Sequence, residues 1–298
     1  MRWTDRLLLL GLTAIWGLNF AVIKIGLREV PPLLLCAARF ALVAFPAVLL
    51  LPRPAVQLRN LLVYSTLMFT VQFGLLFGGM WLGLSAGLAS VALQAQAFFT
   101  MAFSAVVAGD RPSAPQLFGA LVAALGLLII AQGSAGDVSL PGLLCVLGAA
   151  ASWGVANVFS KRRLAGVPPI TLVAWGNLFA VLPVLFVSAM VEGIDSWVVA
   201  AARLDATTLW ALAYIVYPTT LFGFGLWAWQ LRRYPAAIVA PYTLVVPVFG
   251  LAGASWLLGE STQPWKLLAA ALVITGLLIN QFGQTLFDRL RQAAGWRA

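Results

Sequence analysis

The chain has 298 residues, of which 62% are hydrophobic and only 9% are charged, with a mean hydropathy of +0.98. Soluble domains carry roughly 25% charged residues, so this composition excludes a soluble globular protein. The net charge of +9 does not indicate nucleic-acid binding, because the basic residues are scattered over loops and form no single face. The composition therefore predicts an all-α membrane protein.

Ten apolar runs, each of about the length that crosses a bilayer, are separated by turn-forming residues. Proline pairs such as Pro31-Pro32 and Pro168-Pro169 fall between runs, where they end one segment and begin the next. Only the gap at 83–87 is short, and a nine-span alternative depends on it. The predicted spans lie near residues 7–27, 33–51, 60–82, 86–107, 114–132, 141–160, 170–190, 208–231, 236–258 and 264–286.

The distribution of Lys and Arg predicts the orientation of the spans. With both termini inside, the inner segments from Arg2 to Arg297 hold 13 of the 18 basic residues, and Arg39 lies within the second span. The other four, 18 − 13 − 1, are Lys24, Arg28, Arg203 and Lys266 in outer segments. Because basic residues accumulate on the cytoplasmic side, we expect a bacterial inner-membrane protein with both termini in the cytoplasm.

Polar and aromatic side chains in mid-span are the candidates for substrate binding, because burial makes a polar group costly unless it has a partner or a ligand. Trp16, Asn19 and Phe20 share one stripe of the first span, and Asn19 either bonds to a neighbouring helix or lines a cavity. Gln94 and Gln96 cannot face the same way on a straight helix, so one of them packs or the helix is distorted there. The other candidates of this half are Tyr64, Met68, Gln72 and Phe99.

Two basic residues lie near the outer ends of the first two spans. Lys24 ends the first span and Arg39 lies about seven residues into the second. Each has two interpretations: it pairs with a substrate carboxylate, or it extends its charge toward the interface and bonds to carbonyl groups.

The eighth and ninth spans are predicted to be broken helices. Residues 236–258 are apolar and uncharged, yet they contain Pro241 and Pro247, and hydrocarbon cannot satisfy the backbone groups that proline frees. We therefore expect this segment to line a substrate path, the alternative being that its kinks serve only packing or gating. The candidates of this half are Trp153, Asn157, Trp175, Tyr214, Pro218, Phe222, Trp227, Pro241 and Tyr242, and the expected hinges are Gly74, Gly223, Pro241 and Pro247.

The chain repeats its own landmarks. A shift of 137 residues places Trp16-Gly17 on Trp153-Gly154 and Lys24 on Lys161, and a shift of 150 places Gly109-Asp110 on Gly259-Glu260. The growing offset indicates an insertion in the outer loop near residues 192–205. Because five spans is an odd number, the second copy enters from the opposite side, which predicts two inverted five-helix repeats at 1–137 and 138–298.

These landmarks also carry a family resemblance that covers essentially the whole chain. Trp16 to Phe20 with Lys24, the Pro31-Pro32 pair, Arg39, and the two Gly-acid pairs resemble the EamA family of the drug/metabolite transporter superfamily. The resemblance implies ten helices in two inverted halves and export of small metabolites. Within the family, the richness in Trp, Gly and Pro resembles the YddG-type aromatic amino acid exporters.

Residue types and motifs that the sequence lacks reduce the number of possible functions. The chain has no histidine, no nucleotide-binding G-x-x-x-x-G-K-[ST] motif, and no carboxylate in mid-span. We therefore expect that the protein is not an enzyme and has no cofactor or metal site. We expect a monomeric carrier whose partners are a small-molecule substrate and the lipid bilayer. The predicted function is export of aromatic or neutral amino acids by alternating access, downhill and without a coupling ion. A broad drug or metabolite carrier is the alternative, and a membrane enzyme or a channel is a remote one.

Overall fold

The computed structural model describes residues 1–133 and 138–293, and these residues form helices and no strand. Ten helical segments are long and apolar enough to cross a membrane, which confirms ten spans over nine. Arg297 and the boundary residue Asp137 lie outside the described residues. The unbroken spans are α1 (Trp3–Gly26), α2 (Pro32–Leu50), α7 (Ala114–Ala131), α8 (Leu140–Arg163), α9 (Pro169–Val191) and α15 (Pro264–Ala293).

The four other spans change their helical geometry part-way across. The third is α3 (Leu58–Ser65), η1 (Thr66–Val71) and α4 (Gln72–Trp81), and the fourth is α5 (Ala86–Ala92), η2 (Leu93–Ala95) and α6 (Gln96–Ala108). The eighth is α11 (Ala206–Tyr214), η3 (Ile215–Phe222) and α12 (Gly223–Arg233), and the ninth is α13 (Ala236–Val239), η4 (Ala240–Val245) and α14 (Val246–Leu258). The break predicted in the ninth span is confirmed, and it is the segment η4, which contains Pro241 and ends before Pro247.

These irregular segments occupy matching places in the two halves. Both η1 and η3 are π-helical, and a shift of 149 residues places the first residue of one, 66, on the first residue of the other, 215. Both η2 and η4 are 3-10 helical, and a shift of 150 places residues 93–95 on 243–245. Such segments are rare in helices and occur frequently at functional sites. The paired distortions agree with the internal repeat.

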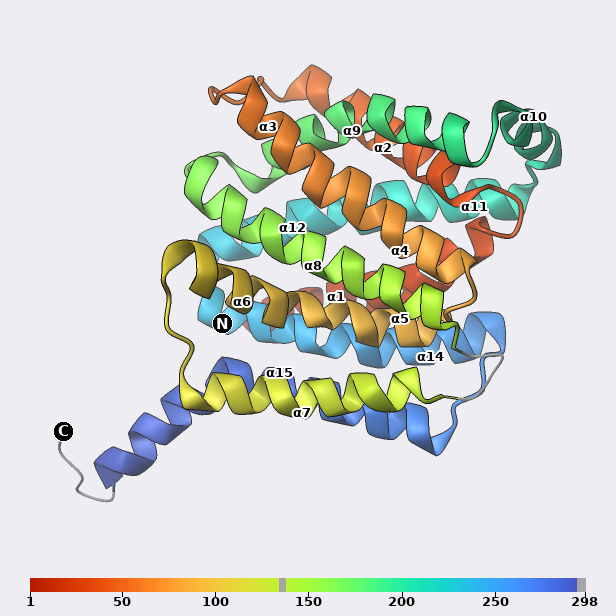
Figure 1. Ribbon diagram of the computed structural model, residues 1–298. Helices are drawn as coiled ribbons and strands as arrows, with labels where there is room; N and C mark the ends of the chain where they lie inside the picture. The colour runs from red at the N-terminus through yellow and green to blue at the C-terminus, as the bar shows by residue number, and fades with distance from the viewer. Residues whose placement is uncertain (134–137, 294–298) are drawn as a thin grey trace.

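The helices pack as layers with their long axes roughly parallel (Figure 1). At one edge α2 packs on α9, and at the other α7 packs on α15. Between these pairs lie α1, α8 and all four interrupted spans. The N-terminus lies at the left end of Figure 1 and the short helix α10 (Ile194–Arg203) at the right end. This helix fills the place where the sequence offset indicated an insertion.

Glycine allows the closest helix contacts in this central region. A Cβ atom on Gly17 would lie 2.4 Å from Phe249 Cβ and 2.7 Å from the Val246 carbonyl oxygen, so α1 and α14 touch at backbone distance. Small residues permit this kind of contact in membranes. The ninth span is thereby held against the first by packing that tolerates no side chain.

Candidate functional site

Five side chains in the middle of the bundle carry buried polar atoms that have no protein partner. They come from spans one, two, three and eight, and we call them the polar centre: Asn19, Arg39, Thr70, Gln72 and Thr219. Their helices pack on one another, as α1 on η3, α2 on both α4 and η3, and α4 on η1. An unpaired buried polar group costs about 1–3 kcal/mol, so this concentration makes the polar centre the candidate binding site.

Arg39 is the charged member of the polar centre and is only 3% exposed. Its Nη2 atom donates to Thr220 Oγ1 at 3.1 Å, and the guanidinium lies 3.9 Å from the centre of the Phe73 ring. Its Nε and Nη1 atoms have no partner. Within residues 1–133 and 138–293, Arg39 forms no ion pair with a carboxylate. It therefore does not snorkel to an interface, and it retains two donors for an anionic group.

The π-helical turn of the eighth span shows how the chain compensates for Pro218. Thr220 Oγ1 donates to the Ile215 carbonyl at 2.8 Å, and Trp16 Nε1 donates to the Thr219 carbonyl at 3.0 Å. Side chains thus occupy two carbonyl groups of the distorted turn, as expected where proline interrupts a membrane helix. Trp16 links the first span to this turn, and Gly223 leaves room for it, because a Cβ there would lie 2.8 Å from Trp16 Nε1.

Aromatic side chains extend from this turn toward the end of the bundle that holds the N-terminus (Figure 1). We call this the inner end, and the opposite one the outer end, after the orientation that the sequence predicts. The Trp16 ring centre lies 5.8 Å from that of Phe224 and 5.4 Å from that of Trp227. Tyr242 of η4 belongs to the same partly buried cluster, and the Tyr214 hydroxyl donates to the Ile15 carbonyl at 3.1 Å. The structure therefore brings Trp16, Tyr214, Trp227 and Tyr242 together around α1.

A second group of predicted residues meets between α6 and α8. Asn157 Nδ2 donates to Thr100 Oγ1 at 3.2 Å and to Gln96 Oε1 at 3.5 Å. Phe99 packs beside Gly154, where a Cβ would lie 2.9 Å from Phe99 Cβ. Asn157 therefore bonds between helices while remaining half-buried. Gln94 and Gln96 are both half-buried, and the 3-10 turn between them is the distortion that their spacing predicted.

Several predicted residues lie apart from both groups. Trp175 donates to the Leu51 carbonyl at the end of α2, at 3.2 Å, and Phe222 is 52% exposed in a groove on the outside of α1. Tyr64 is buried against Phe69, beside the half-buried Met68. Phe20 is buried in the main core.

The outer ends of the two halves are joined by groups that the sequence analysis used only as landmarks. The Glu260 carboxylate accepts from the first two N–H groups of α5, Ala86 at 2.7 Å and Gly87 at 3.1 Å. Lys24 donates to the carbonyl groups of Met80 and Leu84, the latter at 3.2 Å. Lys24 is thereby engaged at the outer end, whereas Arg39 keeps two donors without a partner. The recurrence of the Gly-acid pair was the available signal for Glu260.

Burial along the fourth span differs sharply between its two ends. All seven residues of α5, the outer part, are buried. None of the thirteen residues of α6, the inner part, is buried. At the outer end α5 packs on α14 and α1, whereas at the inner end α6 packs on α8 and α13 packs on α12. The two halves touch at both ends, because at the inner end Gln230 Nε2 donates to the Asp5 carbonyl at 3.0 Å and Arg162 donates to the Val107 carbonyl at 2.8 Å.

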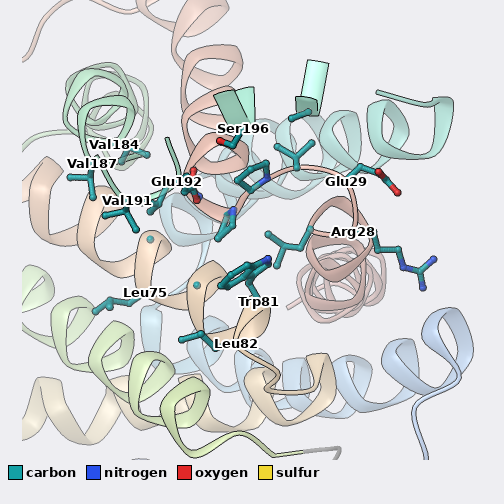
Figure 2. Close-up of a pocket in the computed structure, with 18 of the residues that line it drawn as sticks. Arg28, Glu29, Leu75, Trp81, Leu82, Val184, Val187, Val191, Glu192 and Ser196 are labelled. Atoms are coloured by element: carbon teal, nitrogen blue, oxygen red, sulfur yellow. The ribbon is translucent and has the colours of Figure 1, made fainter. Parts of the chain in front are cut away.

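A cavity of about 970 Å³ opens at the outer side, between α4, α9, α10 and the loop before α2 (Figure 2). Its walls are mostly apolar, with Trp81, Val187 and Val191 among them, and of the predicted residues it includes only the hinge Gly74. The Glu192 carboxylate at its edge already has hydrogen-bond donors, because it accepts from the backbone N–H groups of Leu33 and Leu34 at 2.7 and 3.1 Å. Thr70 of the polar centre also belongs to its wall, so the cavity reaches the polar centre from the outer side.

Ten apolar spans around a polar, helix-breaking centre define the class of polytopic membrane proteins with a buried polar site. Comparison with known protein families identifies one family. Residues 5–132 and 140–281 each match the EamA-like transporter family, and the chain belongs to that family. The two matches lie on either side of the predicted boundary between halves.

Named relatives are similar over nearly the whole chain. A "probable amino-acid metabolite efflux pump" of Salmonella typhimurium is 42% identical over 94% of this chain and 95% of its own length. The protein of the same name in Escherichia coli is 40% identical over the same shares. An "uncharacterized inner membrane transporter" of Escherichia coli, YedA, is 24% identical over 94% of this chain and 91% of its own. A solved crystal structure with 20% identity matches the fold with a TM-score of 0.60, covering 94% of this chain and 98% of that one.

Proposed function

We propose that this protein exports aromatic and other neutral amino acids across the bacterial inner membrane by alternating access, and that Arg39 binds the substrate carboxylate. The observation that carries the proposal is the buried guanidinium, which retains two unpartnered donors and lacks a carboxylate partner among the described residues. An isolated buried charge is costly, and pairing with an anion offsets much of that cost.

The other members of the polar centre fit the rest of an amino acid. The oxygens of Asn19 and Gln72 and the Thr219 hydroxyl are unpartnered, and these neutral acceptors suit the three donors of an ammonium group. The Trp16 indole, bonded to the Thr219 carbonyl, begins the aromatic wall with Phe224 and Trp227. An aromatic side chain would pack against this wall. The names of the Salmonella typhimurium and Escherichia coli relatives support export of amino-acid metabolites.

The internal repeat, with a family match in each half, supports the transport cycle. An exporter loads substrate from the cytoplasm, so its cycle includes a conformation that is open at the inner end. In an inverted repeat, the opposite conformation exchanges the roles of the two ends. The orientation with both termini in the cytoplasm and the monomeric state belong to this proposal.

Counterflow in proteoliposomes tests the substrate class. Vesicles loaded with unlabelled tryptophan should accumulate labelled tryptophan, phenylalanine and leucine, because all three present the carboxylate and ammonium groups. Tryptophan amide, which lacks the carboxylate, should compete at least roughly 30-fold more weakly, since removing one partner of a buried charge pair costs about 2 kcal/mol or more. Equal competition by the amide, or equal flux of unrelated metabolites, would instead favour a broad carrier.

The same vesicles test ion coupling. The described carboxylates lie in loops or at span ends, and Glu192 and Glu260 are bound to helix N-termini, so the polar centre has no group for a proton relay. We expect tryptophan flux at fixed internal pH to be unchanged when a pH gradient is imposed. Flux that rises several-fold with the gradient would contradict the uncoupled mechanism.

A further inference from the structure

A shallow groove of about 520 Å³ runs along the outside of α1, between α1 and the eighth span. Its wall extends from Thr4 to Ile15 on α1 and includes Phe222 and Leu226 on the eighth span, and Thr4 is the one polar residue among the described residues that line it. Gly11 keeps the middle of the groove open, because a Cβ atom there would meet no atom within 4 Å. The groove is separate from the polar centre, none of whose five residues lines it.

The groove has the length of one bilayer leaflet. Eleven helical steps (15 − 4) separate Thr4 from Ile15, and a rise of 1.5 Å per residue makes this roughly 16 Å. Half of a hydrocarbon core of about 30 Å is ~15 Å. The groove therefore extends from the inner end to about the middle of the membrane, which suits one acyl chain of the adjacent leaflet.

Two hydrogen bonds show what lies beyond the inner end of the groove. Gln230 Nε2 donates to the Asp5 carbonyl at 3.0 Å. The backbone N–H of Arg2 donates to the Tyr234 hydroxyl at 3.4 Å. The start of α1 and the end of α12 are therefore antiparallel neighbours, and Arg2 lies at the level of the last residue of α12, Arg233.

Arg233 continues the side of α12 that forms the groove. It follows Leu226 by seven residues, which is about two helical turns, and its guanidinium lies 5.1 Å from the centre of the Trp229 ring. Arg2 and Arg233 are both exposed, and within the part of the chain that the structure describes neither forms an ion pair with a carboxylate. Asp5 is buried, and its carboxylate accepts from a tyrosine hydroxyl. Two uncompensated positive charges therefore lie where the groove meets the membrane surface.

We propose that the groove binds one anionic phospholipid, with an acyl chain between α1 and the eighth span and its phosphate held by Arg2 and Arg233. Basic residues between helices at the membrane surface suit anionic headgroups. A second copy of this chain fits less well, because a two-fold contact at this face would bring the same arginines together. Phe222 then contacts lipid, outside the substrate path. The inference does not rest on the proposed transport function.

Native mass spectrometry of the full chain in detergent measures lipid binding directly. The probes are dioleoyl phosphatidylglycerol, which is anionic, and dioleoyl phosphatidylcholine, which has the same acyl chains and no net charge. Arg2→Gln with Arg233→Gln should weaken binding of the anionic lipid by roughly 30-fold, because each arginine near an anionic surface contributes about 1 kcal/mol. Binding of the neutral lipid should not change. The exposed pair Lys161→Gln with Arg163→Gln, at the end of α8, is the matched control and should alter neither lipid.

Gly11→Leu tests the groove itself. The leucine side chain extends into the groove, and its Cβ meets no other atom, so the variant should fold and should bind both lipids several-fold more weakly. Gly78→Leu is the matched control, because a Cβ there also meets no atom within 4 Å and position 78 lines the outer cavity instead. It should leave the binding of both lipids unchanged.

Each other outcome would overturn part of this inference. Equal binding of the two lipids by the parent, or an equal loss in the α8 control, would exclude the headgroup site. Unchanged binding in Gly11→Leu would exclude the groove as the place of the acyl chain. A dimer that Gly11→Leu dissociates would assign the groove to a second copy of the chain. Misfolding would abolish both lipids together, so a loss confined to the anionic lipid, with binding retained in Arg2→Lys with Arg233→Lys, excludes that explanation.

Discussion

Replacing Arg39 with methionine is expected to lower kcat/KM for tryptophan transport by roughly 30-fold or more, because a buried charge that loses its partner costs about 2–5 kcal/mol. Methionine keeps much of the apolar volume and removes the guanidinium. The measurement is initial counterflow rate against tryptophan concentration, in vesicles with equal amounts of protein.

Thermal unfolding in detergent separates binding from folding in this variant. Because Arg39 is buried without a carboxylate partner, its removal is expected to leave the unfolding temperature unchanged or to raise it. Arg39→Lys, which keeps the charge but changes the donor geometry, should retain more transport than Arg39→Met. A variant that unfolds at a much lower temperature yet still discriminates tryptophan from its amide would show that Arg39 serves only the fold.

The largest effect on stability is expected at Gly17, where α1 touches α14. A Cβ atom there would meet Phe249 Cβ at 2.4 Å, the Val246 carbonyl oxygen at 2.7 Å and the Gly250 nitrogen at 2.8 Å. Backbone atoms cannot move aside as a flexible side chain can, so Gly17→Ala should cost about 1–3 kcal/mol through overpacking. Fluorescence-detected size-exclusion chromatography after heating gives the midpoint of unfolding.

Gly11 on the same helix is the matched control, because a Cβ there meets no atom within 4 Å. Gly11→Ala should raise the midpoint slightly, since glycine within a helix costs roughly 0.5–1 kcal/mol relative to alanine. Equal midpoints for the two variants would contradict the close contact between the first and ninth spans.

The sequence predicted the elements that depend on local composition. Runs of apolar residues long enough for a bilayer located ten spans, and the proline pairs located their ends. The break in the ninth span followed from Pro241 and Pro247 because proline lacks the N–H group that a helix needs. The distortion near Gln94 is one of the two alternatives that helical periodicity left open.

Features that depend on tertiary contacts were not predictable in the same way. The π-helical turn at 66–71 contains no proline or glycine, so nothing local distinguishes it from a regular helix. Trp175 was expected at the site because it is a mid-span aromatic. Its indole instead donates to the carbonyl group at the end of α2, because the packing of the helices places it there. Glu260 lies in a loop by sequence, and only the fold places it at the N-terminus of α5.

The account depends most on the polar region between the two halves being the substrate site, reached from the cytoplasm. A single cysteine at Asn157, half-buried on α8, in the background without Cys36 and Cys145, tests this by reaction with a charged, membrane-impermeant thiol reagent in oriented vesicles. We predict reaction from the cytoplasmic face only, slowed several-fold by saturating tryptophan, while a cysteine at the exposed Arg163 reacts at a rate that tryptophan does not alter. Reaction at position 157 that tryptophan leaves unchanged, or that proceeds only from the outer face, would contradict the account.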